Sequence, residues 1–270
     1  MLSFLSAPCL DGFSLLVLLP LCAGVFLASF LDAIAGGGGI ISVPAHLLAF
    51  GDLPASYALG TNKVSAAIGT ACSTARFIRT GCVRWRLFGP AIAFALAGSF
   101  IGTKLQHLTP DTVLKYLLLA VLPVVAFLTL RDREWPDGPG EIEPRTQRLT
   151  VWAASFLIGG YDGYYGPGTG TFLMLVFIRA ARLDIRQAAG GVKVINLSSN
   201  VGSLVTQLLY GQVFLGVGLA ASIASVAGHY WGSGLAIRNG GRLVRPAVLV
   251  VLLLLTVKVG SELLFPDLWK

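Results

Sequence analysis

The stretch D-A-I-A-G-G-G-G-I-I-S-V-P at Asp32–Pro44 decides the fold, because the chain carries a second version of it 130 residues later. The second version reads D-G-Y-Y-G-P-G-T-G-T at Asp162–Thr171. Each copy has an aspartate, a glycine-rich break in an apolar run, and a lysine 31 residues after the aspartate, which is Lys63 or Lys193. Ionisable residues are rare and costly inside apolar runs, so their recurrence at one offset indicates an internal repeat.

The composition around these two copies is that of a membrane protein. The chain has 270 residues, of which 55% are hydrophobic and 12% charged, and its mean hydropathy is +0.76. A soluble domain carries about 25% charged residues. Apolar runs of roughly 20 residues, which match a hydrocarbon layer about 30 Å thick, recur along the chain. We therefore expect an all-α integral membrane protein embedded in the lipid bilayer, and the net charge of +7 requires no nucleic-acid partner.

Two halves of five apolar segments each can be drawn. The ten segments are expected at 12–31, 36–50, 57–79, 86–106, 112–131, 147–161, 166–180, 187–209, 213–236 and 245–264. The stretch 131–148 is rich in proline, glycine and mixed charge, which is typical of a surface linker. The sequence thus predicts a first membrane repeat at 1–130, a hydrophilic cytoplasmic linker at 131–148 and a second membrane repeat at 149–270.

Loop charges predict that the two repeats are inverted in the membrane. Four arginines lie at 76–86, whereas the matching loop near Gly211 has no lysine or arginine. The loop at 179–186 carries three arginines, whereas its counterpart near Asp52 has none. Because cytoplasmic loops carry the excess of basic residues, we expect the loops at 76–86, 131–148, 179–186 and 238–245 in the cytoplasm. Both termini then face the outside.

The second, sixth and seventh segments are short for a membrane span, and the glycine-rich stretches interrupt the chain beside them. Short segments broken by glycine or proline at matching positions of two halves are the best sequence indication of a transporter's binding site. We expect either broken helices or re-entrant hairpins here.

The glycine runs are candidate anion-binding loops. Glycine lets the backbone approach a ligand closely, and a helix that begins after such a loop points free N–H groups at it. The alternative is that glycines only allow close helix packing, which we favour for Gly98 and Gly102. The candidate substrate-binding glycines are Gly36, Gly37, Gly38, Gly39, Gly166, Gly168 and Gly170.

Two lysines and three asparagines complete the candidate substrate site. Lys63 and Lys193 either contact the ligand with their charge or extend to the membrane interface. Asn196 and Asn200 follow Lys193 on one helical face, and Asn62 precedes Lys63. These amides either face a cavity or hydrogen-bond between helices.

The two aspartates are candidates for proton coupling. Asp32 and Asp162 either carry protons, or cap a broken helix and pair with a lysine. His229 lies in the ninth segment at the position equivalent to Ser99, and no clear role follows from its place in the sequence.

Several strings resemble the TauE/SafE family of small prokaryotic membrane permeases. They are L-G-T-N-K at 59–63 with the preceding glycine run, G-x-V-x-W at 81–85, Y-D-G-Y-Y-G-P-G-T-G-T at 161–171 and K-V-I-N-L-S-S-N at 193–200. The resemblance covers 31–258. It implies export of sulfite or a related organosulfur anion across the cytoplasmic membrane, coupled to the electrochemical gradient. It maps this role onto Asn62, Lys63, Asp162, the second glycine loop, Lys193, Asn196 and Asn200.

The leading hypothesis is a secondary transporter, acting as an exporter, that binds a small sulfur-containing anion such as sulfite or a sulfonate between the repeats. A passive anion channel, or a permease for a different small molecule, is the alternative. An enzyme is not expected, because the three histidines are scattered and form no metal or acid–base cluster. Neither a metal nor another cofactor is expected, and no nucleotide motif is present. The sequence leaves the oligomeric state and the coupling ion open.

Overall fold

The computed structural model describes residues 8–51, 53–110 and 140–239. This part of the chain is helical apart from a short hairpin of β1 (Pro8–Leu10) and β2 (Phe13–Ser14), which the sequence analysis did not predict. Asp11 and Gly12 turn the hairpin with positive φ angles of 51° and 85°. The all-α class is thus confirmed. The expected segments at 112–131 and 245–264, and the first half of the expected linker, lie outside the described residues.

The helices fall into two sets of four. The first set is α2 (Leu15–Ala35), α3 (Gly39–Phe50), α4 (Ala55–Arg79) and α5 (Trp85–Leu108). The second is α7 (Pro144–Tyr164), α8 (Thr169–Arg179), α9 (Ile185–Leu209) and α10 (Leu215–Asn239). Each helix of the second set begins within one residue of the position 130 beyond its counterpart. These eight helices correspond to eight of the ten expected segments, and α3 and α8 are short, with 12 and 11 residues.

The sixth segment was expected to be short, at 147–161, and this expectation is wrong. Helix α7 has 21 residues and begins at Pro144, inside the stretch expected to be linker. Proline is well suited to the first turn of a helix, where its missing N–H costs nothing. The polar ends of α7, with Arg145 and Arg148 at the start and Asp162 near the end, lie outside the apolar run that hydropathy detects.

Each of the main packing contacts between helices has a counterpart in which every helix is replaced by the equivalent helix of the other set. Helix α5 lies along α7 and α10 lies along α2, while α4 and α9 contact each other and also pack against α10 and α5. The α5–α7 contact depends on small residues: a Cβ atom on Gly98 or Gly102 would collide with the α7 backbone at Phe156 or Gly160. These glycines therefore allow close helix packing, as expected from the sequence.

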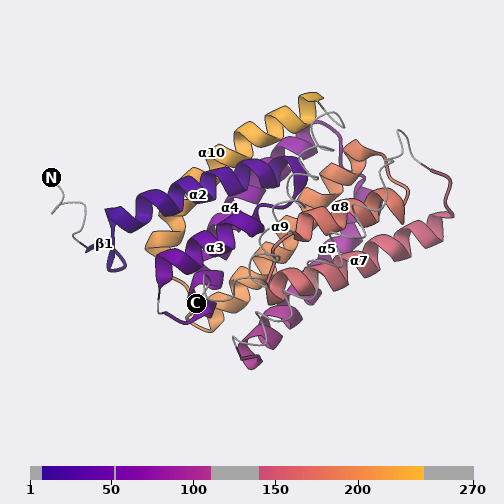
Figure 1. Ribbon diagram of the computed structural model, residues 1–270. Coiled ribbons are helices and arrows are strands. Elements are labelled where there is room, and N and C mark those ends of the chain that lie inside the picture. Colours follow the sequence, from indigo (N-terminus) through magenta and orange to yellow (C-terminus); the bar gives the residue numbers. More distant parts are fainter. Residues whose placement is uncertain (1–7, 52, 111–139, 240–270) are drawn as a thin grey trace, which may run out of the picture.

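The two short helices turn back along the helices that precede them. Phe13, just before α2, contacts Phe50 at the end of α3, with ring centroids 4.9 Å apart. At the start of α7, Gln147 Nε2 donates to the carbonyl oxygen of Ala181, just beyond α8, at 2.7 Å. At the end opposite its glycine break, each hairpin is therefore held together by a direct contact between residues of its two arms. In Figure 1, α3 lies on the side of β1, and α8 lies toward the opposite side.

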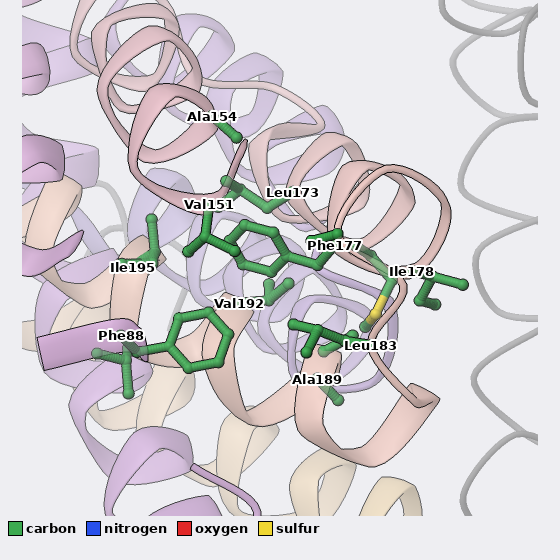
Figure 2. Packing of buried hydrophobic residues seen from close by; sticks show 14 of the residues in the cluster. Phe88, Val151, Ala154, Leu173, Phe177, Ile178, Leu183, Ala189, Val192 and Ile195 are labelled. Carbon is green, nitrogen blue, oxygen red and sulfur yellow. The ribbon is translucent and has the colours of Figure 1, made fainter. Parts of the chain in front are cut away.

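An apolar core holds α8 against α5 and α9. Phe88 and Phe177 are fully buried and their ring centroids lie 5.3 Å apart. Figure 2 shows them with Val192 and Ile195 of α9 and Val151 of α7. Close side-chain packing of this kind holds helices together in a lipid bilayer, so this core keeps α8 in place against α5 and α9.

Three polar loops lie at one end of the helices. Arg84, before α5, donates to Gln187 Oε1 at the start of α9, at 3.4 Å. The Gly140 N–H donates to the Arg182 carbonyl oxygen at 3.1 Å. Asp184 caps α9 by accepting from two backbone N–H groups at 2.9 and 3.0 Å. Among the described helices, α2 and α5 are long and apolar enough to cross a membrane, while α3 and α8 are apolar but shorter.

Candidate functional site

The two glycine breaks meet at the centre of the molecule. Helix α2 ends at Gly36, whose φ of 78° is left-handed, and α8 begins after Gly168, whose φ is 82°. The Thr171 N–H donates to the Gly36 carbonyl oxygen at 3.1 Å, and a Cβ on Gly36 would collide with the Gly170 backbone. Glycine is required at this contact both for its positive φ and for the close approach of two backbones.

Asp32 lies at the first break and is held by both halves. Its Oδ1 accepts a hydrogen bond from the Gly38 N–H at 3.2 Å, at the start of α3. Its Oδ2 forms an ion pair with Lys193 Nζ on α9 at 3.1 Å, and Lys193 also donates to the Asp32 carbonyl oxygen. Asp32 thus caps the broken helix and pairs with a lysine, which is one of the two roles considered for it.

Asp162 lies at the second break and is paired with the other lysine. Lys63 Nζ is 3.0 Å from Asp162 Oδ2, and it also donates to the Asp162 carbonyl oxygen at 2.9 Å. Two hydroxyl groups donate to the same carboxylate: Thr169 Oγ1 at 3.0 Å and Ser199 Oγ at 2.7 Å. The Lys63 ammonium makes a further hydrogen bond to Asn200 Oδ1 at 3.1 Å.

A cavity of about 50 Å³ lies between these two aspartates. It is lined by ten of the residues selected from the sequence: Asp32, Gly36, Gly38, Gly39, Asn62, Lys63, Asp162, Gly166, Asn196 and Asn200. Four others, Gly37, Gly168, Gly170 and Lys193, are not among its lining residues. A water needs about 10–15 Å³ measured in this way, so the cavity has room for a few waters or a small ion.

The charges around the cavity are balanced. Two buried lysines face two buried carboxylates, and the carboxylates of Asp32 and Asp162 lie beside the first turns of α3 and α8. The amino end of a helix attracts negative charge, and here that place is taken by a side chain of the protein. An anion entering the cavity would therefore add a charge to a site that is already neutral.

The asparagines supply polar groups without charge. Asn200 Nδ2 donates to Asn196 Oδ1 at 3.3 Å, and both line the cavity. Asn62 Oδ1 is buried and finds no hydrogen-bond partner among the residues that the structure describes. A buried polar group without a partner commonly indicates a missing water or ion. Because an amide can present either its oxygen or its N–H₂ group, Asn62 is suited to contact a bound solute.

Sequence reasoning missed three polar residues at this site. Thr169 and Ser199 hold Asp162, and neither hydroxyl is distinguishable in sequence from the many serines and threonines that bond their own helix. His229 lines the cavity and its Nε2 lies 3.9 Å from Asp32 Oδ2. The rule that an ionisable residue in a membrane helix is functional by default would have selected His229. Within the described part of the chain, no three histidine, cysteine or acidic side chains are grouped to hold a metal ion.

Comparison with known proteins gives the family. The family model described as "Sulfite exporter TauE/SafE" matches residues 21–259. A "Probable membrane transporter protein ORF9" from Sinorhizobium sp is 34% identical over 244 residues, covering 90% of this chain and 92% of that protein. A "Probable membrane transporter protein" from Haemophilus influenzae is 34% identical over 251 residues, covering 92% and 95%.

A third relative, "Probable membrane transporter protein YfcA" from Escherichia coli, is 32% identical over 266 residues, which cover 93% of this chain and 96% of that protein. No solved structure matches the chain. These relatives are named as bacterial membrane transporters, in agreement with the helical fold and its apolar α2 and α5. The chain therefore belongs to the TauE/SafE family of membrane transporters and is a multi-pass protein of the prokaryotic cytoplasmic membrane.

Proposed function

We propose that this protein is a secondary transporter that exports a small sulfur-containing anion, such as sulfite or a sulfonate, through the cavity between the two glycine breaks. The observation that carries the proposal is the cavity itself. It is enclosed by residues of both halves, and the first turns of two broken helices, α3 and α8, border it. Half-helix amino ends that point at a central cavity are the usual anion site of transporters. The choice of a sulfur anion rests on the family description.

The architecture behind the proposal is a pair of inverted membrane repeats joined by the hydrophilic stretch before α7. The hairpins α2–α3 and α7–α8 would be re-entrant elements that enter from opposite sides of the membrane and meet at their glycine breaks. The contacts that close the two hairpins at their open ends support this. So does the gathering of the basic loops 80–84 and 180–184 at one end, which the positive-inside rule assigns to the cytoplasm.

Within this architecture, we assign anion binding to uncharged donors first. The backbone of the glycines that line the cavity (Gly36, Gly38, Gly39 and Gly166), together with Asn62, Asn196 and Asn200, would replace the water shell of the anion. Lys63 and Lys193 would supply the positive charge once their carboxylate partners shift or are neutralised. A neutral resting site also explains how a cavity at mid-membrane is stable without its substrate, since unpaired buried charges are strongly destabilising.

Alternating access would follow from motion of one repeat against the other around the central contact of α4 and α9. The crossed ion pairs make this motion cooperative, because each break is tied to the opposite half. A passive channel would instead need a continuous water-filled path. The described cavity has a volume of only about 50 Å³, which favours a transporter over a wide open pore.

Uptake by proteoliposomes tests this function. The purified protein is reconstituted, and entry of radiolabelled sulfite is compared with that into protein-free liposomes, with thiosulfate, sulfate and methanesulfonate as competitors. We expect saturable uptake that at least one other sulfur anion inhibits. Rates that rise linearly with concentration without saturation would indicate a channel. Failure to move any of the four anions would reject the assignment of a sulfur-anion substrate.

A further inference from the structure

The two carboxylates of the site occupy equivalent positions, yet their surroundings differ. Asp162 accepts from two hydroxyl groups and from Lys63, and its side chain is 4% exposed. Asp32 accepts from one backbone N–H and from Lys193, and its side chain is 12% exposed. The imidazole of His229 lies beside Asp32, whereas hydroxyl groups lie beside Asp162. One carboxylate is therefore surrounded by hydroxyl groups and a lysine, and the other adjoins a group that can gain or lose a proton.

Three substitutions between the repeats produce this difference. At the offset of 130, Thr169 corresponds to Gly39 and Ser199 corresponds to Gly69, so the first half lacks both hydroxyl donors. His229 corresponds to Ser99. The missing side chain at Gly69 makes room for the imidazole, because a Cβ at Gly69 would collide with His229 Cδ2 and with Ser225 Oγ. Around Asp32, one histidine from the second half thus stands in place of the two hydroxyl groups that lie around Asp162.

His229 is placed to connect the cavity with Asp32. It is 2% exposed and lines the cavity together with Asp32 and Ser225. Its Nε2 lies 3.9 Å from Asp32 Oδ2, which a small side-chain rotation converts into a hydrogen bond of about 3 Å. Its Nδ1 is buried and finds no hydrogen-bond partner among the described residues. A histidine that lies between a polar cavity and a carboxylate can carry a proton from one to the other.

The charged groups around Asp32 are few. Lys193 on α9 and His229 on α10 approach its carboxylate directly. Lys63 on α4 and Asp162 on α7 line the same cavity and neutralise each other. The residues of α3 and α8 that line the cavity carry no charge. Addition of one proton to Asp32 therefore leaves the Lys193 charge uncompensated and raises the net charge of the site by one.

We propose that Asp32 is the proton-binding carboxylate of the transport cycle, that His229 passes the proton between the cavity and Asp32, and that Asp162 remains an ionised structural partner of Lys63. This inference rests on the proposed anion-transport function. A hydronium ion in the cavity gives its proton to the neutral imidazole of His229, which forms the imidazolium and leaves a water molecule. The imidazolium then gives the proton on Nε2 to Asp32 Oδ2, which leaves a neutral imidazole and a carboxylic acid.

The consequence is that a proton and an anion bind together. The charge gained by the site on protonation of Asp32 equals the charge that a monoanion brings. By reciprocity, the proton raises anion affinity by the same factor by which the anion raises proton affinity. The proton and the anion then move in the same direction. Because together they carry no net charge, the membrane potential neither drives nor opposes their joint movement.

The test measures anion transport as a function of pH in proteoliposomes. The probe is methanesulfonate or thiosulfate, whichever the wild-type protein carries, because neither changes its charge in the range where histidine and buried carboxylates titrate. For the wild-type protein we expect the KM to be roughly tenfold lower at acidic than at alkaline pH, which is the size of a typical coupling between two sites. For Asp32→Asn, which resembles the protonated state, we expect a KM that no longer depends on pH.

The other variants separate the roles of the neighbours. Asp162→Asn should lower the rate but keep the pH dependence of KM. His229→Gln should keep the pH dependence of KM, because Asp32 still titrates, and should slow proton-driven net uptake more than anion exchange at equal pH. His46→Gln is the matched control, since His46 is a buried histidine on α3 that does not line the cavity. His46→Gln should leave the ratio of proton-driven net uptake to anion exchange unchanged.

The outcomes are distinguishable. A wild-type pH profile retained in Asp32→Asn, or lost in Asp162→Asn instead, would overturn the inference. If His229→Gln slows net uptake and anion exchange equally, His229 has only a packing role, and the proton relay is contradicted. If Asp32→Asn does not insert, Asp32→Glu should displace the pH midpoint, and an unchanged midpoint would count against the proposal. Transport that is independent of pH in the wild type would contradict the coupling alone, whereas no transport at all would contradict the anion-transport function beneath it.

Discussion

Lys63, in the first half of the chain, forms a buried ion pair with Asp162 in the second half, with 3.0 Å between Nζ and Oδ2. Lys193 and Asp32 form the same pair with the halves exchanged, at 3.1 Å. Each glycine break is thus held by a lysine from the other half. The two pairs lie on either side of the cavity and connect any movement of one break to the other.

The energetic role of the crossed pairs can be measured by removing one partner or both. Lys63→Gln or Asp162→Asn alone leaves one charge of the pair buried without its partner, and for each we expect a loss of about 3–5 kcal/mol in the free energy of unfolding. The double variant Lys63→Gln/Asp162→Asn removes both charges and should recover most of that loss. Unfolding by sodium dodecyl sulfate, followed by circular dichroism, provides the measurement. A double variant as unstable as the sum of the two single variants would show that the pair is not coupled.

The contact between the glycine breaks predicts a sharp effect of one methyl group. Gly36→Ala forces an alanine into a left-handed φ of 78° and into the Gly170 backbone, so it should cost about 2–5 kcal/mol. Gly81→Ala is the matched control: Gly81 also follows a helix with a positive φ, at 70°, but its Cβ would meet nothing within 4 Å. It should cost only the backbone strain of about 1–2 kcal/mol. Equal losses in the two variants, measured by the same unfolding assay, would mean that the breaks do not touch.

The inverted arrangement predicts that equivalent loops are labelled from opposite sides. Thr80 and Tyr210 lie 130 residues apart, both are exposed, and both follow the last residue of a helix, α4 or α9. In a background without native cysteines, Thr80→Cys should react with an impermeant maleimide only in inside-out vesicles. Tyr210→Cys should react only in intact cells. Labelling of both from the same side would rule out inverted repeats.

The asparagine pair predicts a change in affinity without a change in fold. Asn200 accepts a hydrogen bond from Lys63 and lines the cavity. We expect Asn200→Ala to raise the KM for sulfite by about tenfold, equivalent to about 1.4 kcal/mol of binding free energy. Ser198→Ala, on the same helix, removes only a hydroxyl that bonds the Val194 carbonyl oxygen and should leave the KM unchanged. Similar kinetics for both variants and the wild type would place the substrate elsewhere.

Much of the fold could be predicted from the sequence, because hydropathy and the 130-residue offset depend only on local composition. The helices begin within a few residues of the expected segments, and α3 and α8 are short as expected. The errors have physical reasons. Helix α7 extends beyond its apolar run through Arg145 and Arg148, and hydropathy does not detect a helical turn made of charged residues.

The candidate site was identified in its parts but not in its connections. The repeat made Asp32, Asp162, Lys63 and Lys193 recognisable, but sequence equivalence cannot say that each lysine reaches across to the other half. That pairing depends on the packing of α4 against α9, which is a tertiary property. His229 was not assigned a role for a related reason: its importance follows from the space left by Gly69, which becomes visible only when α4 and α10 are placed together.

Anion passage through the cavity between the glycine breaks is tested most directly by counterflow. Proteoliposomes are loaded with unlabelled sulfite and diluted into a trace of radiolabelled sulfite, and the label inside is followed with time. We predict transient accumulation above equilibrium for the wild-type protein, and its loss in the double variant Asn62→Ala/Asn196→Ala at equal reconstitution. No accumulation with sulfite, thiosulfate or methanesulfonate, or accumulation undiminished in the double variant, would contradict transport of a sulfur anion through this site.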